Sequence, residues 1–161
     1  RDEQSDLMDL LSSFVNTAQL NEDLFKKSKH LTLSILGASS RNQIQDIVQK
    51  SFTENFGVNN CKLAFYENSG IGAIEDKTGM SLHKGAVYCG SFSKEKMEYL
   101  FKDEKVESVA LAVLVDNKEI GILMLGSYER TRYLGDEDTT FIEYIRDILE
   151  KKLELIDSLD A

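Results

Sequence analysis

Along the first 37 residues, apolar side chains recur every three to four positions, the spacing that gathers them on one face of a helix. A single helix of that length would run for about 50 Å, farther than one small domain can cover. We therefore predict that part of this stripe needs a partner. A break between Asn16 and Asn21 would instead give two shorter helices packed on one domain. The stripe consists of Leu7, Leu10, Leu11, Phe14, Ala18, Leu24, Phe25, Leu31, Ile35 and Leu36.

A second amphipathic helix is predicted directly after the first. Gly37 can end the first helix, and Ser40 can begin the next one. Ser40 and Gln43 have the spacing of a capping box, in which two side chains bond to each other's backbone N–H groups. Gly57 closes this second helix, whose apolar face consists of Ile44, Ile47, Val48, Phe52 and Phe56.

Alternation with a period of two replaces the helical spacing after residue 60. Cys61, Leu63 and Phe65 alternate with their neighbours in the pattern of a half-buried strand. Residues 67–85 hold four glycines and little periodicity, so we predict a long loop there with at most one short strand. Residues 86–90 form a short predicted strand.

The clearest strand pair follows a short helix. Ser93 is placed to cap that helix, whose predicted inner face is Met97, Leu100 and Phe101. Two runs then follow, at residues 108–115 and 120–127. Both are apolar on both faces, which predicts central strands joined by a hairpin connection at Asp116-Asn117-Lys118.

The chain closes with another predicted helix that begins at Asp136 or Asp138, where acidic residues suit the helix dipole. This helix runs beyond what the sheet needs. Two long terminal helices that flank a small sheet predict a homodimer in which the helices pack as a bundle. The stripe of the last helix consists of Phe141, Ile142, Ile145, Ile148, Leu149, Leu153, Ile156 and Leu159.

Composition narrows the classes of partner. The 161 residues fit one domain with appended helix, and the formal net charge of −9 disfavours nucleic acid and anionic lipid. No apolar run is long enough to span a membrane. The chain opens with no secretory leader pattern, and Cys61 and Cys89 make no disulfide framework. We therefore expect a cytoplasmic protein.

Several short stretches share a characteristic order and spacing: Cys89–Phe92, Tyr99–Phe101, Ser108–Leu111, Gly121–Ser127, Arg132-Tyr133, Thr139 and Phe141. In these stretches the chain resembles the DUF484 family, a bacterial family of GAF-like proteins of unassigned activity. The resemblance implies an α+β fold with a GAF-like central antiparallel sheet flanked by helices, with long N- and C-terminal helices. It implies a helical dimerisation segment at residues 1–37 and a GAF-like domain at residues 38–161. It implies no catalytic residues.

A candidate ligand site follows the second central strand, where polar residues replace apolar ones. Two arginines there can bind a carboxylate or phosphate through paired hydrogen bonds. In the alternative, Arg132 pairs with Glu129, Asp136 or Asp138 to hold the loop, and Tyr133 packs at the edge of the core. In GAF-like domains the pocket lies between the sheet and the loops and short helix over one face. The candidate ligand-binding residues are Tyr66, Tyr88, Cys89, Ser91, Phe92, Ser127, Arg130, Arg132 and Tyr133.

Catalytic and metal chemistry find little support in the sequence. A reactive cysteine needs an electropositive setting or a base, and only His30 and His83 are present. We expect Cys89 to pack as a small hydrophobic residue, and we expect no metal and no cofactor. The glycine-containing stretch at residues 70–79 lacks the strand-turn-helix context of a phosphate loop.

These observations favour a non-enzymatic sensory or binding module whose small ligand biases the packing of its terminal helices. The alternative is a structural protein–protein interaction module, in which its own aromatic residues fill the pocket and a partner docks on the N-terminal helix. A third hypothesis, an enzyme using thiol chemistry at Cys89 with Cys61 assisting, has the weakest support.

Overall fold

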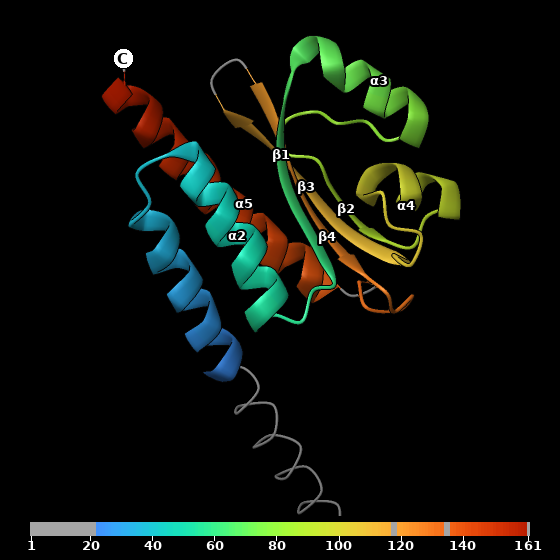
Figure 1. Cartoon of the computed structure of the whole chain (residues 1–161), viewed down its shortest axis with the longest axis horizontal. Helices are drawn as coiled ribbons and strands as arrows, with labels where there is room; N and C mark the ends of the chain where they lie inside the picture. The colour runs from blue at the N-terminus through green and yellow to red at the C-terminus, as the bar shows by residue number, and fades with distance from the viewer. Residues whose placement is uncertain (1–21, 117–118, 134–135, 161) are drawn as a thin grey trace, which may run out of the picture.

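A four-stranded antiparallel sheet forms the centre of the molecule, in the strand order β1-β4-β3-β2 (Figure 1). The computed structural model describes residues 22–116, 119–133 and 136–160. The predicted hairpin is confirmed, because its two strands are the central ones and Asp116 pairs with Glu119. Its connection at residues 117 and 118 lies outside the described residues. The strands are β1 (Asn60–Glu67), β2 (Val87–Gly90), β3 (Ser108–Asp116) and β4 (Glu119–Ser127).

Helices cover both faces of the sheet, which confirms the α+β class. One face, here called the helical face, carries α2 (Arg41–Asn55) and α5 (Asp136–Asp160), and the helix of residues 22–36 lies beside them (Figure 1). The other face carries two shorter helices, α3 (Asn68–Thr78) and α4 (Lys94–Phe101). Each face has its own buried cluster of apolar side chains.

The predicted caps of α2 and α4 are present. The Ser40 hydroxyl accepts from the Gln43 backbone N–H at 3.2 Å, and the Ser93 hydroxyl accepts from the Lys96 backbone N–H at 3.3 Å. The other half of the capping box is shifted by one residue, since the Gln43 side chain accepts from the Ser39 N–H at 2.7 Å. Both helices therefore begin where the sequence places them.

The predicted loop at residues 67–85 is wrong, because α3 occupies most of it. Gly70 and Gly72 weaken helix propensity, but neither takes the left-handed conformation that would break a helix. Ile71 and Ile74 are buried against the sheet, and this burial compensates for the glycines. Gly79, with φ of +71°, ends the helix.

The two terminal helices differ in how fully they are covered. The apolar stripe of α5 from Ile142 to Ile156 is buried within the chain, in the cluster that also holds Leu31 and Ile35. This stripe packs on β3 and β2 of the sheet, and the helix of residues 22–36 adds to its cover. Lys152 Nζ donates to the Leu36 carbonyl at 2.7 Å. The stripe residues at 7–18 and the break expected between Asn16 and Asn21 lie outside the described residues. None of the described helices has the length and apolar character needed to cross a membrane.

Candidate functional site

The structure does not bring the nine predicted ligand-binding residues together. Successive strand residues point to opposite faces, so Tyr88 and Cys89 of β2 belong to different sides of the sheet. Tyr66, Tyr88 and Phe92 pack with the cluster under α3 and α4, whereas Cys89 and Tyr133 pack with the cluster on the helical face. A single pocket cannot include them all.

Several of the nine residues, Ser127 and Tyr88 among them, have local structural roles. Ser127 is buried, and its hydroxyl accepts from the Glu129 backbone N–H at 3.1 Å. The Tyr88 hydroxyl donates to the Ser81 carbonyl at 2.7 Å and accepts from the Ser81 N–H at 3.1 Å. These bonds hold the chain after β4 and the segment between α3 and β2.

The two arginines separate as well. Arg130 lines a hollow of about 280 Å³ beside the start of α4, together with Ser91 and Phe92. Arg132 and Tyr133 line a different cavity, on the helical face. Arg132 holds its loop through backbone carbonyls: its N–H donates to Glu129 and its guanidinium to the residue that caps α2.

Tyr66 lies in a groove that the sequence did not predict as a whole, here called the α3–α4 groove. Its volume is about 310 Å³, and it lies between the β1 and β4 side of the sheet and the two short helices. The floor is apolar, and the rim carries two ammonium groups and two tyrosines. The groove is lined by Lys62, Tyr66, Ile74, Tyr99, Leu100, Lys102, Ile122 and Met124.

The two lysines of the groove lack a carboxylate partner. No ion pair within 4.0 Å involves Lys62 or Lys102 in the described part of the chain, although the protein is acidic overall. Burial lowers the pKa of Lys62, and the positive charge of Lys102 lowers it further. Burial and the neighbouring Tyr99 raise the pKa of Tyr66. A bound anion would relieve the repulsion between the two ammonium groups.

The carboxylate that follows Lys102 in sequence is already engaged. Asp103 accepts from the Lys105 backbone N–H at 3.0 Å, the Tyr128 hydroxyl at 2.8 Å and the Asn60 side chain at 3.5 Å. These donors lower the pKa of the Asp103 carboxyl, led by the Lys105 backbone bond. Asp103 therefore organises the turn after α4, and it forms no ion pair with either groove lysine.

Lys102 takes an unusual backbone conformation at the end of α4. Its φ is +54°, and it is the one non-glycine residue with positive φ in the described ranges. Its N–H donates to the Glu98 carbonyl at 2.7 Å, which closes the helix. Glycine or asparagine is usual at such a position, because a β-carbon there is strained. The residue at this strained position, beside the groove, is a lysine.

Sequence reasoning missed Lys62, Tyr99 and Lys102. Alternation along β1 places Lys62 and Tyr66 on the same side of the strand, and this signal was available in the sequence. The mistaken loop in place of α3 removed one wall of the groove, so nothing indicated that these side chains meet.

The described residues add no candidates for metal binding or for thiol chemistry. The described residues contain no group of three or more His, Cys, Asp or Glu side chains that could hold a metal ion. Burial raises the pKa of the Cys61 thiol to about 12, which keeps it protonated and unreactive. Cys89 is half-buried against the core of the helical face.

Comparison with known proteins gives one family match. A family model described as a protein of unknown function, DUF484, matches residues 1–157. A search of curated proteins found no match to the chain.

Proposed function

We propose a binding function for this chain, which belongs to the DUF484 family. It acts as a non-enzymatic, cytoplasmic, GAF-like regulatory module that binds a small anion in the α3–α4 groove. The antiparallel sheet with short helices over one face supports the GAF-like reading. The family description assigns no activity, so the proposal depends on the groove itself.

One observation carries the proposal: Lys62 and Lys102 line the same apolar-floored groove, and neither has a carboxylate partner among the described residues. Unmatched cations at the rim favour an anionic group, such as a carboxylate or phosphate. The hydroxyls of Tyr66 and Tyr99 can donate to the same group. The floor of isoleucine, leucine and methionine side chains suits the apolar or planar body of the ligand.

A thermal-shift screen of nucleotides, amino acids and carboxylates tests the groove. Isothermal titration of any ligand found is then repeated on Lys62→Met and Lys102→Met, with Lys50→Met on the exposed side of α2 as the matched control. Loss of one charged hydrogen bond should weaken binding about tenfold or more in each groove variant. Equal affinity in all variants, or no ligand in the screen, would reject the anion site.

We further propose that the protein is a homodimer joined through its terminal helices. Large apolar side chains are exposed on the helix of residues 22–36, with Phe25 exposed to 67% and Leu33 to 58%. Tyr144 of α5 lines the same surface hollow as these two residues. A second copy that covers this surface would connect the helices of two protomers. A ligand in either protomer could then bias their packing.

Light scattering coupled to size exclusion tests the assembly. The native chain should elute as a dimer at micromolar concentration, and Phe25→Glu together with Leu33→Glu should give a monomer. Lys50→Glu makes a comparable acidic change elsewhere and should leave the dimer intact. A native chain that stays monomeric as its concentration rises would contradict the proposed dimer.

The alternative function, a structural protein–protein interaction module without a ligand, uses the same exposed surface. It is favoured if the screen yields no ligand and a protein partner binds the native chain but not the Phe25→Glu, Leu33→Glu variant. Deleting the whole N-terminal helix would be a poor test, since Leu31 and Ile35 belong to the buried core. Surface substitutions keep that core intact.

A further inference from the structure

A cavity on the helical face lies where the helix of residues 22–36, α2 and α5 meet the sheet. Its volume is about 210 Å³, and its walls come from elements far apart in sequence. Leu24 closes it from the N-terminal helix, and Ala110 and Leu125 form its floor on β3 and β4. The α3–α4 groove is on the other face, and no residue lines both cavities.

Aromatic rings surround most of this cavity. The ring centroids of Phe52 and Phe56 are 5.1 Å apart, and those of Phe56 and Phe141 are 5.4 Å apart. Tyr133, which is buried, adds a fourth ring to the lining. Most of the lining of this partly open cavity is apolar, and apolar cavities of about 150 Å³ are known to admit a benzene ring.

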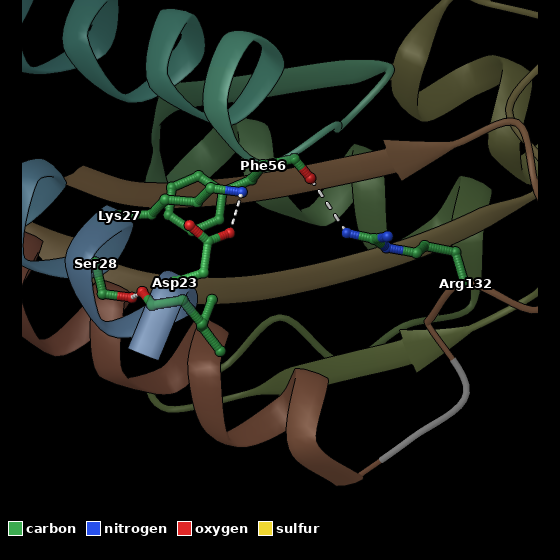
Figure 2. Close-up of polar contacts among 6 residues, drawn as sticks. Asp23, Lys27, Ser28, Phe56 and Arg132 are labelled. Carbon is green, nitrogen blue, oxygen red and sulfur yellow. Dashed lines mark hydrogen bonds and ion pairs between the residues drawn. The ribbon is translucent and has the colours of Figure 1, made fainter. Parts of the chain in front are cut away.

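A single cation lines this cavity. Figure 2 shows Arg132 extending from the segment after β4 to the Phe56 carbonyl oxygen, to which its Nη2 donates at 3.2 Å. The guanidinium carbon lies 5.7 Å from the centre of the Tyr133 ring. A guanidinium has five N–H donors, so one bond to Phe56 leaves others available on this exposed side chain.

The acidic side chain that Figure 2 draws in this region, Asp23, is paired with a lysine. Asp23 precedes Leu24 in the N-terminal helix, and its carboxylate lies 3.1 Å from Lys27 Nζ (Figure 2). Among the residues whose side chains the structure describes, no carboxylate lies within 4.0 Å of the Arg132 guanidinium, and the side chains of Asp136 and Asp138 lie outside that description. The cavity therefore combines an apolar aromatic interior with a guanidinium that can accept an anionic head group.

We propose that this cavity binds a small monocarboxylic acid with an apolar, ring-sized body. The carboxylate bonds to Arg132 through paired N–H donors, and the body lies among the rings of Phe52, Phe56 and Phe141. The volume admits one ring and a short acid group. This site goes beyond the proposed anion site in the α3–α4 groove, because it uses other residues on the opposite face.

Occupancy of this cavity acts on the N-terminal helix. Leu24 belongs both to the cavity wall and to the exposed apolar surface that carries Phe25. A ligand that packs against Leu24 favours the position in which this helix lies against α2 and α5. The acid would thereby stabilise one placement of the helix that carries the proposed dimer surface.

Titration of benzoate, followed by calorimetry and by ligand-detected NMR, tests the site. We expect saturable millimolar or tighter binding, with benzamide about tenfold weaker because it lacks the charge. Arg132→Met should weaken benzoate about tenfold or more and should leave benzamide nearly unchanged. Arg130→Met removes a nearby arginine outside the cavity and serves as the control.

Two further variants separate this site from the groove and from loss of folding. Ala110→Leu adds a larger side chain at the cavity floor and should abolish binding of both probes, with thermal melting used to confirm that the variant is folded. Lys62→Met, in the α3–α4 groove, should leave benzoate affinity unchanged. Absence of saturable binding, equal affinity in Arg132→Met, or loss of binding in Lys62→Met would each overturn the proposal.

Discussion

The two faces of the sheet are built from the same strands but differ in how tightly they are packed and in the polar groups they carry. On the helical face, Leu63 and its neighbours lie under long helices, and Ile145 and Leu149 of α5 are completely buried. On the α3–α4 side, Lys62 and Tyr66 of the same strand β1 line an open groove beside two short helices. Alternation along one strand thus assigns stability to one side and polar groups to the other. The difference shows that the polar groove lies on the side of the sheet where the packing is less complete.

The largest expected effect comes from replacing one aromatic residue on each face with alanine. Phe52→Ala should lower the free energy of unfolding by about 3–5 kcal/mol, because a fully buried ring leaves a cavity. Tyr99→Ala should change it by about 0.5 kcal/mol or less, since Tyr99 is exposed. Urea denaturation measures both changes. Similar losses in the two variants would show that the faces contribute equally.

The centre of the sheet provides a second test, at the contact between β3 and β4. A β-carbon added at Gly121 would lie 2.8 Å from Leu114 Cδ1 and 3.0 Å from Phe65 Cε1. Gly121→Ala should therefore cost about 1–3 kcal/mol through overpacking on the helical face. Gly72→Ala is the control, because a β-carbon there meets nothing within 4 Å. A stable Gly121→Ala variant would mean that this core repacks easily.

Lys102 allows stability and binding to be separated on the groove side. Lys102→Gly relieves the left-handed backbone and should raise the free energy of unfolding by about 1 kcal/mol. The same change removes a rim cation and should weaken anion binding. Lys102→Ala keeps the backbone strain and loses the cation, so it should weaken binding without the gain in stability. If both variants bind the anion normally, Lys102 has only a capping role.

The smallest expected effect concerns the pKa of Lys62 and the pH dependence of stability. Since burial lowers this pKa, the folded protein releases the proton at a lower pH than the unfolded chain does. The free energy of unfolding therefore rises with pH between the two pKa values. Below both values, the cost of burying the charged Lys62 side chain is fully present. Anion affinity should fall over the same alkaline range, as Lys62 loses its charge. Lys62→Met should remove this part of the pH dependence, whereas the raised pKa of Tyr66 remains.

Most of the fold could be predicted from the sequence, because its helices and strands bury apolar residues at regular spacing. The cap at Ser40, the apolar face of α2, the β3–β4 pair and the stripe of α5 follow directly from residue spacing, because each buries one continuous face. α3 was missed because Gly70 and Gly72 obscure a short helix whose stability comes from tertiary contact. Its buried face consists of only Ile71, Ile74 and Thr78.

The sites were less predictable, because they depend on side chains that only the fold brings together. Lys62 and Lys102 come from a strand and a helix end far apart in the chain, and a local motif does not connect them. Sequence reasoning did select Arg132 and Tyr133, which share a cavity, and Tyr66, which lines the groove. It assigned all three to one pocket, since it could not tell which face each would occupy.

The pairing of β1 with β4 has a consequence for how the chain reaches this structure. β3 and β4 form a local hairpin, whereas β1 pairs with β4 only after α3, β2, α4 and β3 have been made. During synthesis β1 therefore emerges from the ribosome without its partner, and closure of a long loop delays its docking. Until that moment the edge of β4 that receives β1 is unpaired, and an unpaired strand edge can pair with another chain.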